Sequence, residues 1–209
     1  MKNNIEKIFE ELKSKGLINE KINLISKKSV MPFKTTITNK ILYDPSFVGI
    51  SPDSIRFILL HEAGHARKVI QIGYLALFIS LLLYLIGYLV ISKITTFSWY
   101  FVVIICLFLF FIVFRMFIPL LKKDEIEADS FAAKKILEGY NNKKPSLIIK
   151  QVFKELRKKK FKSNILRTLL MPISYLIEYH PTNKERITNL IKIEKGQATQ
   201  FPINSDKKQ

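Results

Sequence analysis

The stretch His61-Glu62-Ala63-Gly64-His65 decides how the rest of the chain has to be arranged. His61 and His65 are four residues apart, so a helix places both imidazoles on one face, one turn apart. Two imidazoles in that arrangement can grip a single metal ion, and Glu62 can reach a water molecule beside it. The same pattern also arises by chance, and the two histidines would then be ordinary hydrogen-bonded helix residues.

A metal site on this stretch needs a third ligand from elsewhere, because catalytic zinc keeps three protein ligands and one open position. Four acids compete for this role: Asp124, Glu125, Glu127 and Asp129. Glu125 and Asp129 are four residues apart and share a helix face. One can bind the metal while the other accepts the free N–H of a ligating histidine. Glu127 should point elsewhere, and any of the four could instead belong to a solvated helix start.

The composition indicates a membrane protein. The chain has 209 residues, a net charge of +17 and 48% hydrophobic residues. Residues 69–92 and 94–114 carry no charge, and the apolar run resumes after Arg115 up to Leu121. Each stretch can cross a bilayer at about 20 residues, with Lys93 to Ser98 as the turn. We therefore predict a transmembrane hairpin, the alternative being two buried core helices.

The distribution of charge predicts the orientation of that hairpin. Nearly all Lys and Arg residues flank it, and the connecting loop holds only Lys93, so both flanks should face the cytoplasm at the cell membrane. The positive charge then reflects topology and attraction to anionic lipid, and no nucleic-acid recognition motif is present. The N-terminus lacks the apolar core of a signal peptide. A single cysteine, Cys106, allows no intrachain disulfide.

The rest of the chain reads as short strands followed by helices. Ser51 is a suitable cap for the helix that carries the histidines, with Pro52 in its first turn. The remaining predicted elements are a helix over 3–15, strands over 21–26 and 33–43, helices over 122–137, 146–161, 164–178 and 183–194, and a disordered tail from 197. The hairpin would return the chain to the side it left, so Glu125 would stand at the height of the histidines.

The order of these motifs resembles the HtpX and CAAX prenyl protease family of membrane zinc endopeptidases. The resemblance covers roughly residues 33–190 and rests on Ser51-Pro52, Leu60-His61-Glu62-Ala63-Gly64-His65, Glu125-Ile126-Glu127-Ala128-Asp129, His180-Pro181 and Arg186-Ile187. It implies that Glu125 is the third zinc ligand, that the catalytic domain is cytoplasmic, and that substrate lies extended on an edge strand above the zinc. The chain differs from HtpX-like members in lacking two spans before the motif and the Asn-Ala pair of that strand.

The predicted fold is therefore α+β and mainly helical: a zincin-like metalloprotease domain with a small edge-strand sheet. The two-helix transmembrane hairpin is inserted between the helix of the histidines and the helix of the third ligand. The expected parts are residues 1–68 and 122–196 for the two halves of the catalytic domain, 69–121 for the hairpin and 197–209 for the tail.

The predicted activity is zinc-dependent hydrolysis of peptide bonds in membrane or membrane-proximal proteins. One zinc ion per chain would acidify a water molecule, and Glu62 would take its proton. His180 is the candidate donor to the oxyanion, or else a structural residue. Arg186 should pair with a carboxylate and fix the His180 turn. The substrate strand would contribute Ile37, Thr38 and Asn39.

Other classes stay open at this stage. The chain could be a catalytically silent, membrane-anchored zinc-binding regulator, or a signalling protease like the beta-lactam sensors, although it lacks a sensor domain. Site-2 proteases bury the motif within a span, whereas here the motif precedes the span. The sequence does not determine the physiological substrate or the oligomeric state.

Overall fold

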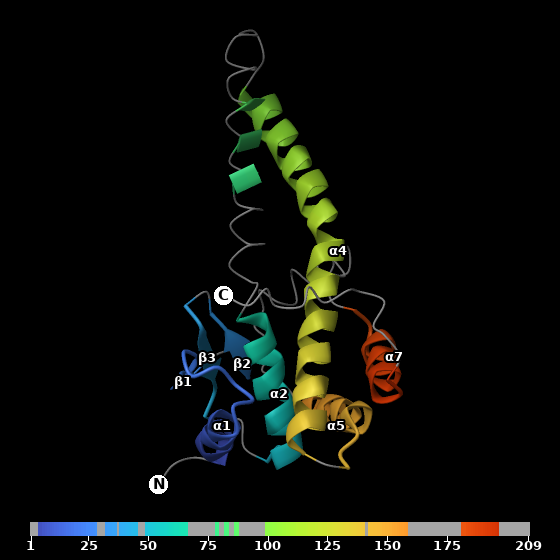
Figure 1. The fold of residues 1–209 in the computed structure, drawn as a ribbon. Coiled ribbons are helices and arrows are strands. Elements are labelled where there is room, and N and C mark those ends of the chain that lie inside the picture. The colour runs from blue at the N-terminus through green and yellow to red at the C-terminus, as the bar shows by residue number, and fades with distance from the viewer. Residues whose placement is uncertain are drawn as a thin grey trace, which may run out of the picture.

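The computed structural model describes residues 4–28, 32–36, 38–45, 49–66, 78–79, 82–83, 86–87, 99–140, 142–158 and 181–196. Its elements in chain order are α1 (Asn4–Ser14), β1 (Asn23–Ser26), β2 (Phe33–Thr35), β3 (Lys40–Tyr43), α2 (Pro52–His65), α4 (Trp99–Gly139), α5 (Pro145–Lys158) and α7 (Asn183–Glu194). The architecture is mainly helical with one small sheet, as the sequence predicts. Figure 1 shows α2 lying between the sheet and the long helix α4.

The sheet has the strand order β1-β3-β2, with β1 parallel and β2 antiparallel to β3. The prediction of one continuous strand over 33–43 is wrong, because the chain reverses between β2 and β3. Asn39 adopts a positive φ of 55° in this turn, a conformation that asparagine tolerates better than most residues. The Thr36 amide donates to the Lys40 carbonyl at 2.8 Å and closes the turn. The reversal makes β2 an edge strand of the described sheet.

Helix α2 begins as its sequence predicts. Ser51 is extended, and its hydroxyl accepts the Ser54 amide at 3.3 Å, while Pro52 occupies the first turn. This cap satisfies a backbone N–H that has no partner within the helix. Apolar residues of α2 are buried on more than one side, because the helix has the sheet on one flank and α4 on the other. These residues are Ile55, Phe57, Leu59, Leu60 and Ala63.

Helix α4 runs without interruption over 41 residues and includes Pro119. The helix predicted over 122–137 is thus the C-terminal part of a longer helix that also contains the second apolar run from Trp99 onward. No helix among the described residues is both long and apolar enough to cross a bilayer. Most of the first apolar run, 69–92, lies outside the described residues, so the hairpin stays a prediction.

Helices α2 and α4 approach each other very closely beside the histidines. A Cβ atom placed on Gly64 would stand 3.0 Å from the Cα atom of Ala128. Ala128, Ala132 and Ala133 are buried along α4. Small residues at a crossing let two helix backbones approach. Glycine at position 64 therefore brings the acids of α4 within reach of the imidazoles of α2.

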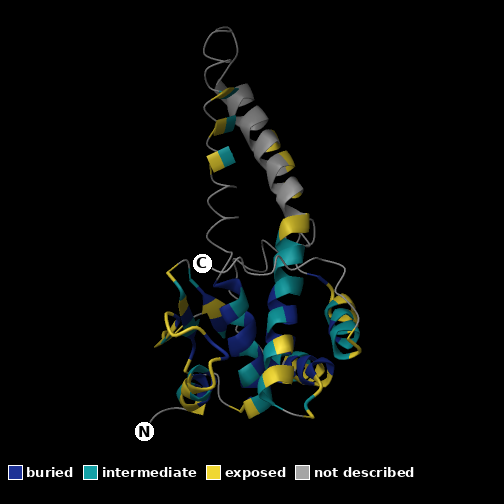
Figure 2. Ribbon diagram, in the orientation of Figure 1, coloured by how far each residue is buried: buried dark blue, intermediate teal, exposed yellow. Residues whose placement is uncertain are grey.

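The remaining helices close the core. The amphipathic stripe predicted for α1 is buried, and it consists of Ile5, Ile8, Phe9 and Leu12. Helix α5 packs against α2, and α7 packs against both α4 and α5. Figure 2 shows that burial is deepest where α2 faces the lower part of α4. The bounds of α1, α5 and α7 agree with the predicted helices to within a few residues, whereas the helix predicted over 164–178 and the tail lie outside the described residues.

Candidate metal centre

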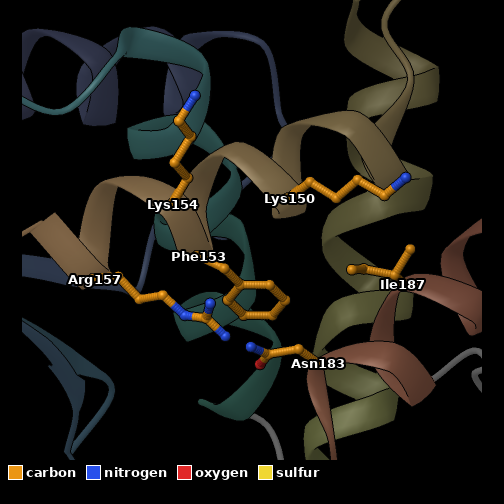
Figure 3. Close-up of a pocket in the computed structure, with 6 residues that line it drawn as sticks. All are labelled: Lys150, Phe153, Lys154, Arg157, Asn183 and Ile187. Atoms are coloured by element: carbon orange, nitrogen blue, oxygen red, sulfur yellow. The ribbon is translucent and has the colours of Figure 1, made fainter.

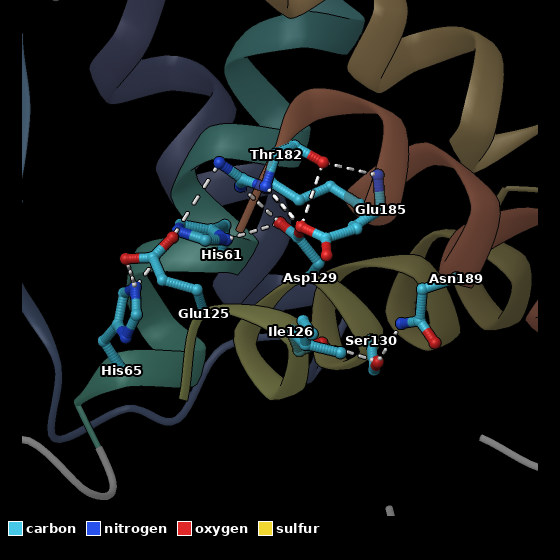
Figure 4. Close-up of polar contacts among 10 residues, drawn as sticks. His61, His65, Glu125, Ile126, Asp129, Ser130, Thr182, Glu185 and Asn189 are labelled. Carbon is cyan, nitrogen blue, oxygen red and sulfur yellow. Dashed lines mark hydrogen bonds and ion pairs between the residues drawn. The ribbon is translucent and has the colours of Figure 1, made fainter. Parts of the chain in front are cut away.

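Three side chains from α2 and α4 converge at the helix crossing (Figure 4). The Nε2 atoms of His61 and His65 are 3.0 Å apart. The Glu125 carboxylate lies 3.7 Å from Nε2 of His61 and 3.4 Å from Nε2 of His65. All three side chains are largely removed from solvent. This cluster can hold a metal ion.

The spacing of the three groups fits zinc. Zinc binds imidazole nitrogen and carboxylate oxygen at about 2.0–2.2 Å, so tetrahedral ligand atoms stand roughly 3.3–3.5 Å apart. The three observed separations of 3.0, 3.4 and 3.7 Å surround that value. Two imidazoles and one carboxylate also form the donor set of a catalytic zinc site, which leaves a fourth position open.

Each histidine is held by its own carboxylate through the other ring nitrogen. Nδ1 of His61 is 2.8 Å from Asp129, and Nδ1 of His65 is 2.8 Å from Asp124. Carboxylates accept hydrogen bonds, so both Nδ1 atoms act as N–H donors, and in a neutral ring Nε2 then carries the lone pair that can bind a metal. Fixing the ring orientation in this way also raises the basicity of the ligand nitrogen.

The acids around the cluster give it a strong preference for cations. Burial alone would lower the pKa of His65, but its hydrogen bonds with Asp124 and Glu125 outweigh that effect and raise the pKa to about 10. The negative charge that draws a proton to this ring also draws a metal cation. Protons and metal therefore compete for the same imidazole.

Asp129 joins α4 to α7 as well as to α2. Arg186 donates two hydrogen bonds of 2.6 Å to it, from Nε and Nη2. Asp129 is fully buried, and burial would raise its pKa, but Arg186 and then His61 outweigh burial and lower the pKa below its ordinary value. Arg186 also lies 3.8 Å from Glu125. The sequence predicts a carboxylate partner for Arg186, and the structure identifies Asp129.

Two further contacts fix the helix that carries Arg186. Thr182 and Glu185 form a reciprocal capping box at the start of α7. Asn189 donates to the Ser130 hydroxyl of α4 at 3.1 Å. Both contacts appear in Figure 4. Hydrogen bonds thus hold α7 in place on both sides of Arg186.

Glu62 is held by the edge strand of the sheet. The hydroxyl of Thr35 on β2 lies 2.8 Å from the carboxylate oxygen Oε2 of Glu62 and 2.7 Å from the Glu62 backbone carbonyl. One hydroxyl proton is thus shared between two acceptors when the carboxylate is ionised. This contact orients the Glu62 carboxylate next to the metal cluster.

A cavity of about 150 Å³ opens beside Glu62, His61 and Arg186. Its other walls are mostly apolar side chains from β2, α2 and α5, namely Phe33, Phe57, Ile58, Ile149, Val152, Phe153 and Leu156. This volume is below the roughly 300–1,000 Å³ of a small-molecule pocket, so the cavity suits a single side chain.

Some predicted site residues are not part of this arrangement. Thr38 and Asn39 lie in the turn between β2 and β3, while Ile37 and His180 lie outside the described residues. Sequence reasoning missed Thr35, and it considered Asp124 only as a possible metal ligand and not as the partner of His65. Thr35 lies within the single strand predicted over 33–43, and its place at the end of an edge strand follows only from the strand reversal. Asp124 directly precedes Glu125, and neighbouring residues of a helix face different directions. Helical spacing therefore does not place Asp124 on the face that Glu125 and Asp129 share.

The fold and the cluster together define a helix-borne HExxH metal centre with a third ligand from a neighbouring helix. A family model for peptidase family M48 matches residues 14–194. The chain belongs to this family, whose members are zinc metalloproteases, and this agrees with the resemblance seen in its motifs. Its cofactor is zinc. No curated protein and no solved structure matches the chain significantly.

The geometry predicts which acid is required for metal binding. Glu125→Ala should lose nearly all of its zinc, because only two imidazoles then point at the ion. Glu127→Ala is the matched control, because Glu127 lies two residues along α4 and outside the cluster. Zinc per chain after dialysis against a weak chelator measures the difference. Loss of zinc from the Glu127 variant, with retention in the Glu125 variant, would show that the ligand is misassigned.

Proposed function

We propose that the protein is a membrane-anchored zinc endopeptidase that hydrolyses peptide bonds of membrane or membrane-proximal proteins. The observation that carries this proposal is the convergence of His61, His65 and Glu125, together with a cavity that both His61 and Glu62 line. Zinc held by these three residues supplies Lewis-acid chemistry, which polarises a carbonyl group and makes a water molecule acidic near neutral pH.

Glu62 is the proposed general base, which takes a proton from water and delivers it to the leaving amine. Thr35 can serve both protonation states of Glu62. When Glu62 is ionised, Thr35 donates to its carboxylate or to its carbonyl. When Glu62 carries the proton, the carboxylic acid can donate to the Thr35 oxygen while the hydroxyl donates to the carbonyl.

The surroundings suggest how a peptide would be oriented. An extended peptide could pair with the open edge of β2, which ends at the Thr35 contact with Glu62. Ile37, Thr38 and Asn39 would then contact one end of that peptide. The apolar cavity beside Glu62 would accept an apolar side chain of the substrate and exclude water from the bond to be cleaved. His180 is the proposed donor to the oxyanion.

Membrane attachment is the second part of the proposal. It is supported by the two uncharged stretches 69–92 and 94–114 and by the basic residues on either side of them. We place the catalytic parts and both termini in the cytoplasm at the cell membrane. A site close to the bilayer would favour membrane or membrane-proximal proteins as substrates.

Glu62→Gln tests the enzyme activity. Cleavage of an unstructured protein should fall on the order of 10²–10⁴-fold because the amide cannot take a proton. Zinc should stay near one per chain because Glu62 is not a ligand. Glu20→Gln, which changes an exposed acid between α1 and β1, should keep both activity and metal. Equal cleavage by wild type and the Glu62 variant would refute the proposal.

Thr35→Val tests the positioning of the base. Valine keeps the shape of threonine but removes the hydroxyl, so kcat should fall roughly tenfold, as expected for a lost hydrogen bond to a charged group. Zinc content should not change. Thr35→Ser restores the hydroxyl and should restore the rate. A serine variant as slow as the valine variant would assign Thr35 a packing role instead.

Topology reporters test the membrane proposal. A reporter fused before Met1 and another fused after Gln209 should both report the cytoplasm, whereas a tag between Thr95 and Thr96 should report the opposite side. Opposite locations for the two termini would mean that the chain crosses the bilayer an odd number of times, and the hairpin would then be excluded.

A further inference from the structure

A second hollow lies against the outer face of α5 and borders the cavity of the metal centre. It has a volume of about 460 Å³ and lies between α5 and the start of α7. Figure 3 shows Lys150, Phe153, Lys154 and Arg157 contributed by α5, and Asn183 and Ile187 contributed by α7. These six residues line what we call the basic groove.

The basic groove is built on one face of a single helix. Lys150, Phe153, Lys154 and Arg157 follow the spacing i, i+3, i+4 and i+7, which places them on one side of α5. From Lys150 to Arg157 the stripe extends roughly 10 Å along the helix. The three cations are close enough to repel one another.

The three cations of the groove lack an acidic partner in the part of the chain that the structure describes. None of them forms an ion pair with any residue that the structure describes. The one acid of α5, Glu155, turns the other way and accepts the Ser51 amide at 3.3 Å. The groove therefore offers an uncompensated positive potential together with an aromatic ring and an amide side chain.

Phe153 connects the groove to the metal centre. It lines both the groove and the cavity that contains His61 and Glu62. The guanidinium of Arg186 lies 5.3 Å from its ring centroid, and Arg186 is the partner of Asp129. A peptide that places one side chain in the cavity can thus place a residue close to it in sequence in the basic groove.

We infer that the basic groove binds an acidic side chain of the peptide substrate, close in sequence to the bond that is cleaved. This inference rests on the proposed function and gives it a substrate class: peptides with Asp or Glu near an apolar residue. The Asn183 amide, which can both donate and accept hydrogen bonds, suits a peptide backbone. Continuity with the metal centre favours peptide over a lipid headgroup, which would need the three cations but not Asn183.

The test uses fluorogenic peptides that share an apolar centre and carry either Glu or Gln at each position in turn. In wild type the Glu peptide should have a kcat/KM roughly two- to fivefold above that of the Gln peptide at one or two neighbouring positions. The preference should shrink as salt is raised, because the groove is exposed to solvent. No preference for Glu at any position would overturn the inference.

Charge reversal then assigns the preference to the groove. In the triple variant Lys150→Glu/Lys154→Glu/Arg157→Glu, the ratio should fall below one, and a Lys peptide should be preferred at the same position. In the milder triple variant with Gln, the ratio should fall to about one. The triple variant Lys21→Glu/Lys27→Glu/Lys134→Glu is the matched control, because it changes the net charge by the same amount at exposed residues outside the groove. An equal loss of preference in the control would mean that the overall charge, and not the groove, is responsible.

A binding measurement separates failure of this inference from failure of the proposed function. Glu62→Gln protein is titrated with the Glu and Gln peptides by fluorescence anisotropy, and with vesicles of anionic phosphatidylglycerol. If wild type cleaves nothing, the proposed function fails, yet tighter binding of Glu peptides that depends on the three cations still supports the groove. Vesicle binding that depends on the three cations, without any preference among peptides, would overturn the inference in favour of lipid.

Discussion

The fully buried carboxylate of Asp129 is the interaction on which the site depends. It lies on α4, receives two hydrogen bonds from Arg186 on α7 and contacts Nδ1 of His61 on α2. Three helices that are far apart in sequence are thus joined at one side chain. Removing one partner of such a buried pair typically costs about 3–5 kcal/mol, because the other charge is left without compensation. The fold and the metal centre therefore both depend on Asp129, and loss of its contacts would weaken both.

The charge balance around this point explains why a strongly basic chain can hold a cation. Glu62, Asp124, Glu125 and Asp129 gather at the site, and Arg186 forms ion pairs with two of them, Asp129 and Glu125. A divalent metal would offset most of this local negative charge. The net charge of the whole chain is +17, so its excess of positive charge stands elsewhere, including the outer face of α5. Segregating the two signs keeps the metal centre electrostatically distinct from the surface that surrounds it.

Much of this arrangement could be predicted from the sequence, because local spacing determines it. The four-residue step from His61 to His65, the Ser51-Pro52 helix start and the pairing of Glu125 with Asp129 on one face all follow from helical periodicity. What escaped prediction depends on tertiary packing. The strand reversal at Asn39 brings Thr35 to Glu62, and the exact rotation of α4 against α2 brings Asp124 to His65. Neither contact can be predicted from a regular spacing of residues, because each joins two elements that meet only in the folded chain.

The close crossing of Gly64 and Ala128 also bears on ionic radius. The separation of the α2 and α4 backbones fixes how far the Glu125 carboxylate can stand from the two imidazoles. A short separation suits an ion with bonds of about 2.0–2.2 Å, whereas calcium needs about 2.3–2.6 Å and more oxygen ligands. Because glycine has no side chain, position 64 permits the short helix separation that suits a small ion. The spacing of two helix backbones thus contributes, together with the nitrogen and oxygen donors, to the preference for a small ion.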